Sequence, residues 1–145
     1  MATVIGQKAT IKNIKYLAGA IKVKANKELL AIGLDIETDA KEKITEDHHV
    51  DTGRLRASLH TENPKTSTNQ YSDGTGRSFK GKLSETPKDN QVFIGTNVKY
   101  AQFIERRDSY MRYAYDKNIP KLKIMAKKLG KLIWEDKYKW QYMTH

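Results

Sequence analysis

The chain has 145 residues, of which 38% are hydrophobic and 30% are charged, and Lys and Arg exceed Asp and Glu by ten. This length fits one domain with a modest core, and the absence of cysteine excludes disulfides and thiolate metal sites. The basic surplus favours acidic partners, either nucleic acid or an acidic protein surface, and is equally compatible with a solvated basic surface.

The N-terminal region lacks the pattern of an export signal. Its lysines come too early and too often for the apolar core of a signal peptide. No stretch approaches the roughly 20 apolar residues that a membrane span requires. We therefore expect a protein that is made and used in the cytoplasm.

The first half of the chain carries the pattern of a long amphipathic helix. Apolar residues recur at steps of three or four from Ile14 to Ile44, so they form a stripe along one helix face. This predicts a helix over residues 10–46, with a bend allowed at Gly33. A coiled coil is the alternative, but the steps do not hold a strict 3.5-residue period. A stripe of this length packs on a sheet or on another helix.

Two strands are expected after this helix. The DTG sequence at residues 51–53 predicts a turn that leads into a strand ending near Glu62. Leu55 and Leu59, however, also fit one helical turn. The run QVFIGT, residues 91–96, alternates as a second strand would.

A polar arm is expected between the two strands. Residues 63–90 are rich in Gly, Ser, Thr, Asn, Pro and Lys and contain few apolar residues. Such a segment buries too little surface to offset the entropy lost on ordering. It predicts a flexible arm with a hairpin tip at residues 72–76.

Two further helices are expected. Asn97 fits an N-cap for a short helix whose apolar face holds Tyr100, Phe103 and Ile104. Asn118 as a cap and Pro120 in the first turn fit the start of a last helix.

The last residues, 134–145, form an aromatic tail that contains Trp134, Tyr138 and Trp140. Aromatic residues at a chain end either fold back onto the domain or are offered to a partner. Both alternatives stay open at this point.

Three residue groups have catalytic or metal-ligating side chains, but each fails on spacing. His48 and His49 are adjacent in a loop, and adjacent ligands close a tetrahedral metal site poorly. Ser58 and His60 lie two residues apart with nothing to orient a base. Residues 74–82, GTGRSFKGK, lack the spacing of a phosphate-binding loop. We expect no enzyme, no cofactor and no metal.

Stand-alone nucleic-acid binding is the alternative function. The arm mixes basic and aromatic residues, the types that combine phosphate contacts with base stacking. Its acidic residues dilute this charge, so the basic surplus is expected in the C-terminal third. Lysines spread around a helix are more often a solvated face than a binding stripe.

Two motifs resemble a known family. VDTGRLRASL, residues 50–59, is followed after an insertion by VFIGTNVKYAQFIE, residues 92–105. They resemble the tail-completion, or head–tail joining, proteins of long-tailed bacteriophages. Members of that family show an aspartate-threonine-glycine-x-leucine-arginine start, a strand ending in glycine-threonine-asparagine, a Tyr-Ala pair and a glutamate. The matching residues are Asp51, Thr52, Gly53, Leu55, Arg56, Gly95, Thr96, Asn97, Tyr100, Ala101 and Glu105.

The resemblance extends over about residues 10–133, and residues 110–129 are similar to the family's final helix. Two features depart from the family pattern. Residues 106–108 are Arg-Arg-Asp where Phe-Gly-Thr is usual, and the proline-rich approach to the last helix is missing.

The resemblance implies an α+β fold, in which a long N-terminal helix packs on a small antiparallel sheet with a hairpin-like arm and a C-terminal helix. It also implies a virion structural protein that forms a homo-oligomeric ring, commonly a hexamer, in the phage neck. Its expected partners are connector or adaptor proteins, the tail tube or terminator, and DNA passing through the lumen. Assembly is expected in the host cytoplasm.

Interface contacts are expected from basic and aromatic residues of the motifs, the arm and the tail, and from one motif glutamate. They are Arg54, Arg56, Tyr71, Arg77, Phe79, Lys80, Lys82, Tyr100, Glu105, Arg106, Arg107, Trp134, Tyr138 and Trp140. The residues expected to shape the fold are Asp51, Gly53, Gly95 and Asn97.

Overall fold

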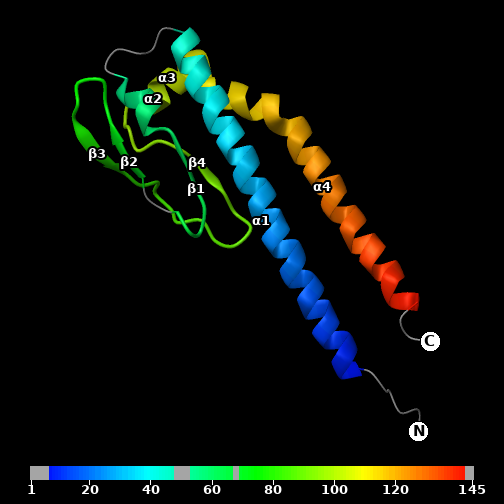
Figure 1. Cartoon of the computed structure of the whole chain (residues 1–145). Coiled ribbons are helices and arrows are strands. Elements are labelled where there is room, and N and C mark those ends of the chain that lie inside the picture. The colour runs from blue at the N-terminus through cyan, green and yellow to red at the C-terminus, as the bar shows by residue number, and fades with distance from the viewer. Residues whose placement is uncertain (1–6, 48–52, 67–68, 143–145) are drawn as a thin grey trace.

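Two long antiparallel helices dominate the molecule. The computed structural model describes residues 7–47, 53–66 and 69–142, and the side chains of residues 15–132 within those ranges. Helices α1 (Gln7–Glu46) and α4 (Tyr110–Tyr142) lie side by side and bring both chain ends to the same end of the molecule (Figure 1). The strands and short helices gather around the other end of α1. This is the α+β arrangement that the sequence predicts.

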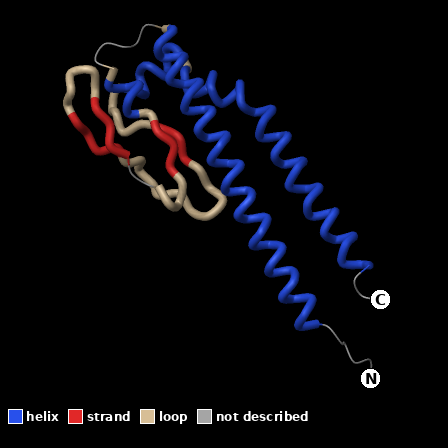
Figure 2. Tube along the Cα trace, in the orientation of Figure 1, coloured by secondary structure: helices blue, strands red, loops and turns tan. Residues whose placement is uncertain are grey.

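The strands form two separate antiparallel pairs (Figure 2). Strand β1 (His60–Glu62) pairs with β4 (Phe93–Gly95), and this pair lies against α1. Strand β2 (Asn69–Ser72) pairs with β3 (Ser78–Gly81) to form the hairpin. A hairpin-like arm between two paired strands is therefore confirmed.

The predicted strand through Glu62 is wrong in its first half. Residues 54–58 form a short helix, α2 (Arg54–Ser58), before β1 begins. Gly53 precedes it with φ 71° and ψ 0°, a left-handed conformation that glycine adopts without steric cost. The helical turn buries both Leu55 and Leu59, which explains why the helical alternative fits better.

Helix α3 (Ala101–Asp108) begins later than the expected cap at Asn97. Its N-cap position is Tyr100, and no side chain caps it. Tyr100 and Phe103 are 41% and 61% exposed, so the expected apolar face of this helix is only partly used within the subunit.

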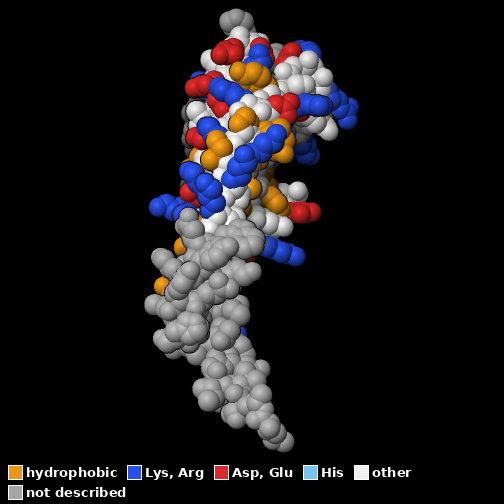
Figure 3. All heavy atoms as spheres, turned by 90° about the vertical axis from the view of Figure 1, so that its right-hand side faces the viewer, with side chains coloured by type: hydrophobic (Ala, Val, Ile, Leu, Met, Phe, Trp, Pro, Cys, Tyr) orange, Lys and Arg blue, Asp and Glu red, His pale blue; other side chains and the backbone are white. Residues whose placement is uncertain are grey.

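Helix α4 begins earlier than predicted. A single residue, Ser109, separates it from α3 and has a left-handed φ of 49°. Asn118 and Pro120 lie inside α4, and Asn118 is buried instead of capping a new helix. Seen from the α4 side, basic, acidic and apolar side chains are interspersed over the described part of the surface (Figure 3).

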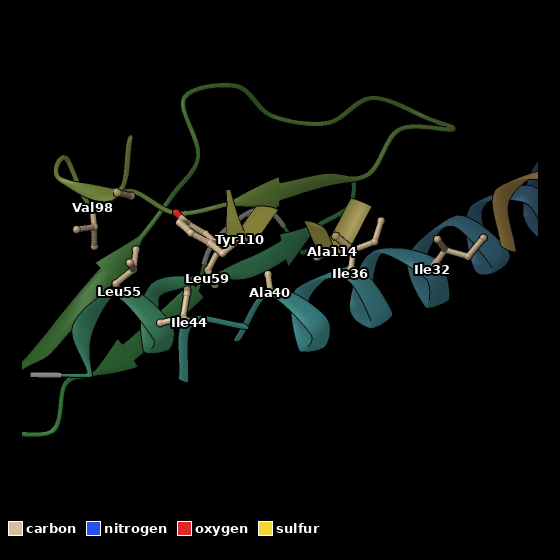
Figure 4. Packing of buried hydrophobic residues seen from close by; sticks show 10 residues of the cluster. Ile32, Ile36, Ala40, Ile44, Leu55, Leu59, Val98, Tyr110 and Ala114 are labelled. Atoms are coloured by element: carbon tan, nitrogen blue, oxygen red, sulfur yellow. The ribbon is translucent and has the colours of Figure 1, made fainter. Parts of the chain in front are cut away.

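The core lies where the second half of α1 meets α2, the residues after β4, and the start of α4 (Figure 4). Ile32 is the first buried residue of the α1 stripe, and the earlier described positions of the stripe are half-buried or exposed. The buried apolar cluster consists of Ile32, Ile36, Ala40, Ile44, Leu55, Leu59, Val98, Ala101, Tyr110 and Ala114.

Gly33 marks the closest approach of α1 to the strands. A Cβ at this position would lie 2.8 Å from methyl groups of both Thr61 and Val92. The Thr61 hydroxyl also lies 3.1 Å from the Gly33 carbonyl oxygen. Helix α1 runs unbroken through this residue, so the glycine permits close packing, and the bend allowed at the sequence level is not needed.

Within the described part of the chain, no helix is long and apolar enough to cross a membrane.

Candidate assembly surface

The side chain of Asn97 holds both strands of the arm hairpin. Its Oδ1 accepts a hydrogen bond from the Tyr71 hydroxyl over 3.0 Å, and its Nδ2 donates to the Lys80 carbonyl over 3.0 Å. An amide suits this position because it offers a donor and an acceptor together. Asn97 therefore acts as a clamp: it ties the turn after β4 to both strands of the arm hairpin.

Thr96 connects the two motif segments. Its hydroxyl lies 2.5 Å from Ser58 Oγ and accepts a hydrogen bond from the Val98 amide over 3.1 Å. Ser58 in turn donates to the Leu55 carbonyl over 2.8 Å. Segments about 40 residues apart in sequence thus meet in one hydrogen-bonded turn.

A three-residue stack fixes the hairpin on α2. The rings of Tyr71 and Phe79 stack with their centroids 5.4 Å apart, and the Arg54 guanidinium lies 4.1 Å from the Phe79 centroid. Tyr71 is only 7% exposed. These three residues, expected at a partner interface, make contacts within the subunit.

A buried polar cluster anchors the end of the arm. Glu62 is 0% exposed, and its Oε1 lies 2.7 Å from His60 Nε2 and accepts from the Leu83 amide over 3.0 Å. His60 Nδ1 forms a hydrogen bond with the Ser58 carbonyl over 2.8 Å. The His60 ring is therefore not hydrogen-bonded to the Ser58 hydroxyl, as a catalytic base would be. This cluster was not expected from the sequence, although His60 and Glu62 lie two residues apart in a strand and therefore on one face.

Glu105 caps α4. Its carboxylate accepts hydrogen bonds from the backbone amides of Met111, over 2.8 Å, and Arg112, over 3.1 Å. A carboxylate at the start of a helix satisfies free amides and complements the helix dipole. The motif glutamate therefore sets the abrupt turn between α3 and α4.

An open groove of about 1040 Å³ runs along β4 between the end of the arm and α3. Leu83, Phe93, Val98 and Ala101 contribute apolar surface to it, and Glu105 contributes a carboxylate. A Cβ on Gly95 would lie 3.2 Å from a Leu83 methyl group, so a side chain there would narrow the groove.

The remaining expected interface residues fall into two groups. Exposed on the surface are Arg56, Arg77, Lys80, Lys82, Tyr100, Arg106 and Arg107, of which Arg107 also bonds Asp108 over 2.6 Å. Trp134, Tyr138 and Trp140 lie outside the side chains that the structure describes. The same holds for His48 and His49, considered above as metal ligands, and for Asp51, expected to shape the fold. Among the described residues, no three metal-ligating side chains come together.

The motifs thus build turns, caps and packing contacts, as in a structural protein. Residues 8–106 match the family described as "Bacteriophage HK97-gp10, putative tail-component". Because the match spans more than half of the chain, the protein belongs to this family. No curated protein and no solved structure matches the chain.

Membership in this family confirms the resemblance seen in the motifs. The protein is a bacteriophage tail component, with a structural role, a place in the virion and other phage structural proteins as partners. Such a family points to a non-enzymatic role.

Proposed function

We propose that this tail component completes the tail and joins it to the head, working in the neck as a homo-oligomeric ring with six copies. In this proposal it assembles in the host cytoplasm between connector or adaptor proteins and the tail tube or terminator. The supporting observation is that the subunit exposes apolar side chains on two different faces. Its motif residues, in contrast, make their contacts within the subunit.

The first face lies on α3. It carries the exposed rings of Tyr100 and Phe103, and α3 ends in exposed Arg106 and Arg107. Aromatic residues and arginine are enriched at protein interfaces and dominate their binding energy. This face has the composition of a protein contact.

The second face lies on α1. Tyr16, Val23 and Leu34 are 78%, 71% and 49% exposed. Their spacings of seven and eleven residues correspond to about two and three helical turns, so they share one side of the helix. Ile36, which packs into the core, is about 200° around the helix from Leu34. This side therefore faces away from the core.

Two different faces are what a ring requires. A head-to-tail contact uses a separate patch on each side of the subunit, whereas a two-fold dimer uses one patch twice. We propose that the α1 face of one subunit packs on the α3 face of the next. Exposed basic residues of α2 and the arm then remain for contacts with other virion proteins, namely Arg56, Arg77, Lys80 and Lys82.

Light scattering coupled to size-exclusion chromatography tests the ring. The wild-type chain should form a closed oligomer alone or with tail-tube and connector proteins. Val23→Glu and Phe103→Glu should each prevent it, because each places a charge in one of the two patches. Tyr115→Glu, which changes an exposed aromatic residue of α4 outside both faces, is the matched control.

A mixture of the two defective variants gives the sharpest result. Only one intact pair of faces remains, so the mixture should form dimers and stop there. A wild-type chain that stays monomeric with every partner, or a mixture that restores rings, would refute the proposed interface.

A further inference from the structure

The net charge of the chain is confined to one half of the helical hairpin. We define the distal hairpin as residues 7–27 of α1 and 121–142 of α4, the end that carries both termini (Figure 1). It contains thirteen lysines and two acidic residues, whereas the rest of the chain contains fourteen basic and fifteen acidic residues. The α+β body is therefore nearly neutral, and the distal hairpin is strongly basic.

The lysines change their environment along α4. Nearer the body, Lys117 and Lys121 pair with Asp39 and Asp35 of α1, each over 2.6 Å. Farther out, four lysines are exposed, and none has an acidic partner among the described residues. They are Lys123, Lys127, Lys128 and Lys131. Within the distal hairpin, Lys22 and Lys121 are paired with Asp89 and Asp35 of the body. The charges of the four lysines farther out are not compensated within the described part of the subunit.

The type of basic residue distinguishes the possible partners. The distal hairpin has no arginine, and all six arginines lie between residues 54 and 112. Protein interfaces are enriched in arginine and depleted in lysine. Lysine is a hydrated point charge that contacts phosphates without the bidentate geometry of arginine. A surface whose only basic residues are lysines fits contacts with the phosphates of a nucleic acid, and such contacts do not depend on the base sequence.

The shape agrees with this partner. The α1 part of the distal hairpin spans about 30 Å at 1.5 Å per residue. This is close to one turn of double-stranded DNA, which offers a regular array of phosphates over that length.

We propose that the lysines of the distal hairpin bind the phosphate backbone of double-stranded DNA without sequence preference. This surface goes beyond head–tail joining and does not require ring formation. It also assigns the DNA contact to the helices and not to the arm.

The test is the salt dependence of DNA affinity for the full-length chain. Fluorescence anisotropy would follow binding to two 30-base-pair duplexes of unrelated sequence between about 50 and 200 mM NaCl. One variant changes Lys123, Lys127, Lys128 and Lys131 to Gln. The matched control changes four exposed lysines of the arm segment to Gln, namely Lys65, Lys80, Lys82 and Lys88.

Both duplexes should bind the wild type equally. The distal variant should reduce the slope of log affinity against log salt by about three to four, because each phosphate contact contributes about 0.9. The arm variant should keep most of the slope. Circular dichroism of both variants checks that the helices are retained.

Three results would overturn the proposal: no binding of the wild type at 100 mM NaCl, a loss in the arm variant equal to that in the distal variant, or a strong preference for one duplex. Polyglutamate that competes as well as DNA at equal charge would also overturn it, since the surface would then fit an acidic protein. None of these results bears on the ring, which is tested separately.

Discussion

The Tyr71 hydroxyl donates a hydrogen bond to Asn97 Oδ1 over 3.0 Å and so joins the arm hairpin to the turn after β4. The same asparagine donates to the Lys80 carbonyl on the other strand of the hairpin. A motif residue that looks like a helix cap in the sequence therefore positions the arm.

Removing this contact should weaken the fold measurably. Tyr71→Phe should lower the free energy of unfolding by about 1 kcal/mol, and Asn97→Ala by about 1–2 kcal/mol because it loses both bonds. Urea denaturation followed by circular dichroism would measure both. If the two residues act through their mutual bond, the double variant should lose less than the sum of the single losses. Full additivity would argue against the clamp.

Gly33 should resist replacement even though it lies within a helix. Ala is about 1 kcal/mol better than Gly in a helix, but a Cβ at residue 33 meets two stiff branched side chains at 2.8 Å. Gly33→Ala should therefore destabilise the protein by about 1 kcal/mol net, since overpacking costs about 1–3 kcal/mol. Gly19, with nothing within 4 Å of its added Cβ, is the control.

Gly19→Ala should instead raise stability by about 0.5–1 kcal/mol. Thermal and urea unfolding of both variants would decide the matter. Equal stabilisation by both substitutions would show that α1 does not approach the strands as closely as described.

The cap on α4 can be tested at Glu105. Glu105→Ala leaves the amides of Met111 and Arg112 without their acceptor and should cost about 1–2 kcal/mol of unfolding free energy. Glu85→Ala removes an exposed glutamate for which no hydrogen bond is found within the described structure, and it should change stability little. Comparable losses in both variants would contradict the capping role.

The pairing of α1 with α4 should depend on acid pH through Asp39. The hydrogen bond from Lys117 lowers the pKa of the Asp39 carboxyl below 3.8, and a bond from Asn118 adds to this effect. A lowered folded-state pKa stabilises the protein above the unfolded value, and the stabilisation disappears as the pH falls through the folded value.

The stability difference between wild type and Asp39→Asn should therefore be largest near neutral pH and shrink below about pH 4. Urea denaturation from pH 7 to pH 3 would measure it. Asp116→Asn, at a residue 58% exposed, should show little pH-dependent difference. A difference for Asp39→Asn that stays constant with pH would exclude this mechanism.

The long helix and the hairpin were predictable because their signals are strong and local. The apolar period of α1 persists over many turns, and the polar composition of the arm contrasts with its flanking strands. Residues 54–59 were ambiguous because Leu55 and Leu59 fit both the two-residue period of a strand and the 3.6-residue period of a helix. In the folded protein a helical turn buries both side chains in the core.

The incorrect predictions concern residues that resemble helix caps in the local sequence but bond to residues far away along the chain. Asn118 looks like a cap but donates from a buried amide to Asp39 and to the Ala114 carbonyl. Asn97 looks like a cap but clamps the arm. The basic charge of the distal hairpin was larger than expected, because the sequence alone indicated a surplus only in the C-terminal third. Only the antiparallel fold shows that the N-terminal lysines join it.

We propose that this tail component completes the particle by joining the tail to the head. Electron microscopy of lysates from a phage whose copy of the gene carries an early stop codon tests it most directly. We expect filled heads and separate tails, with joining restored when the wild-type protein is supplied in trans. Infectious particles with normal heads attached to normal tails in its absence would contradict the claim.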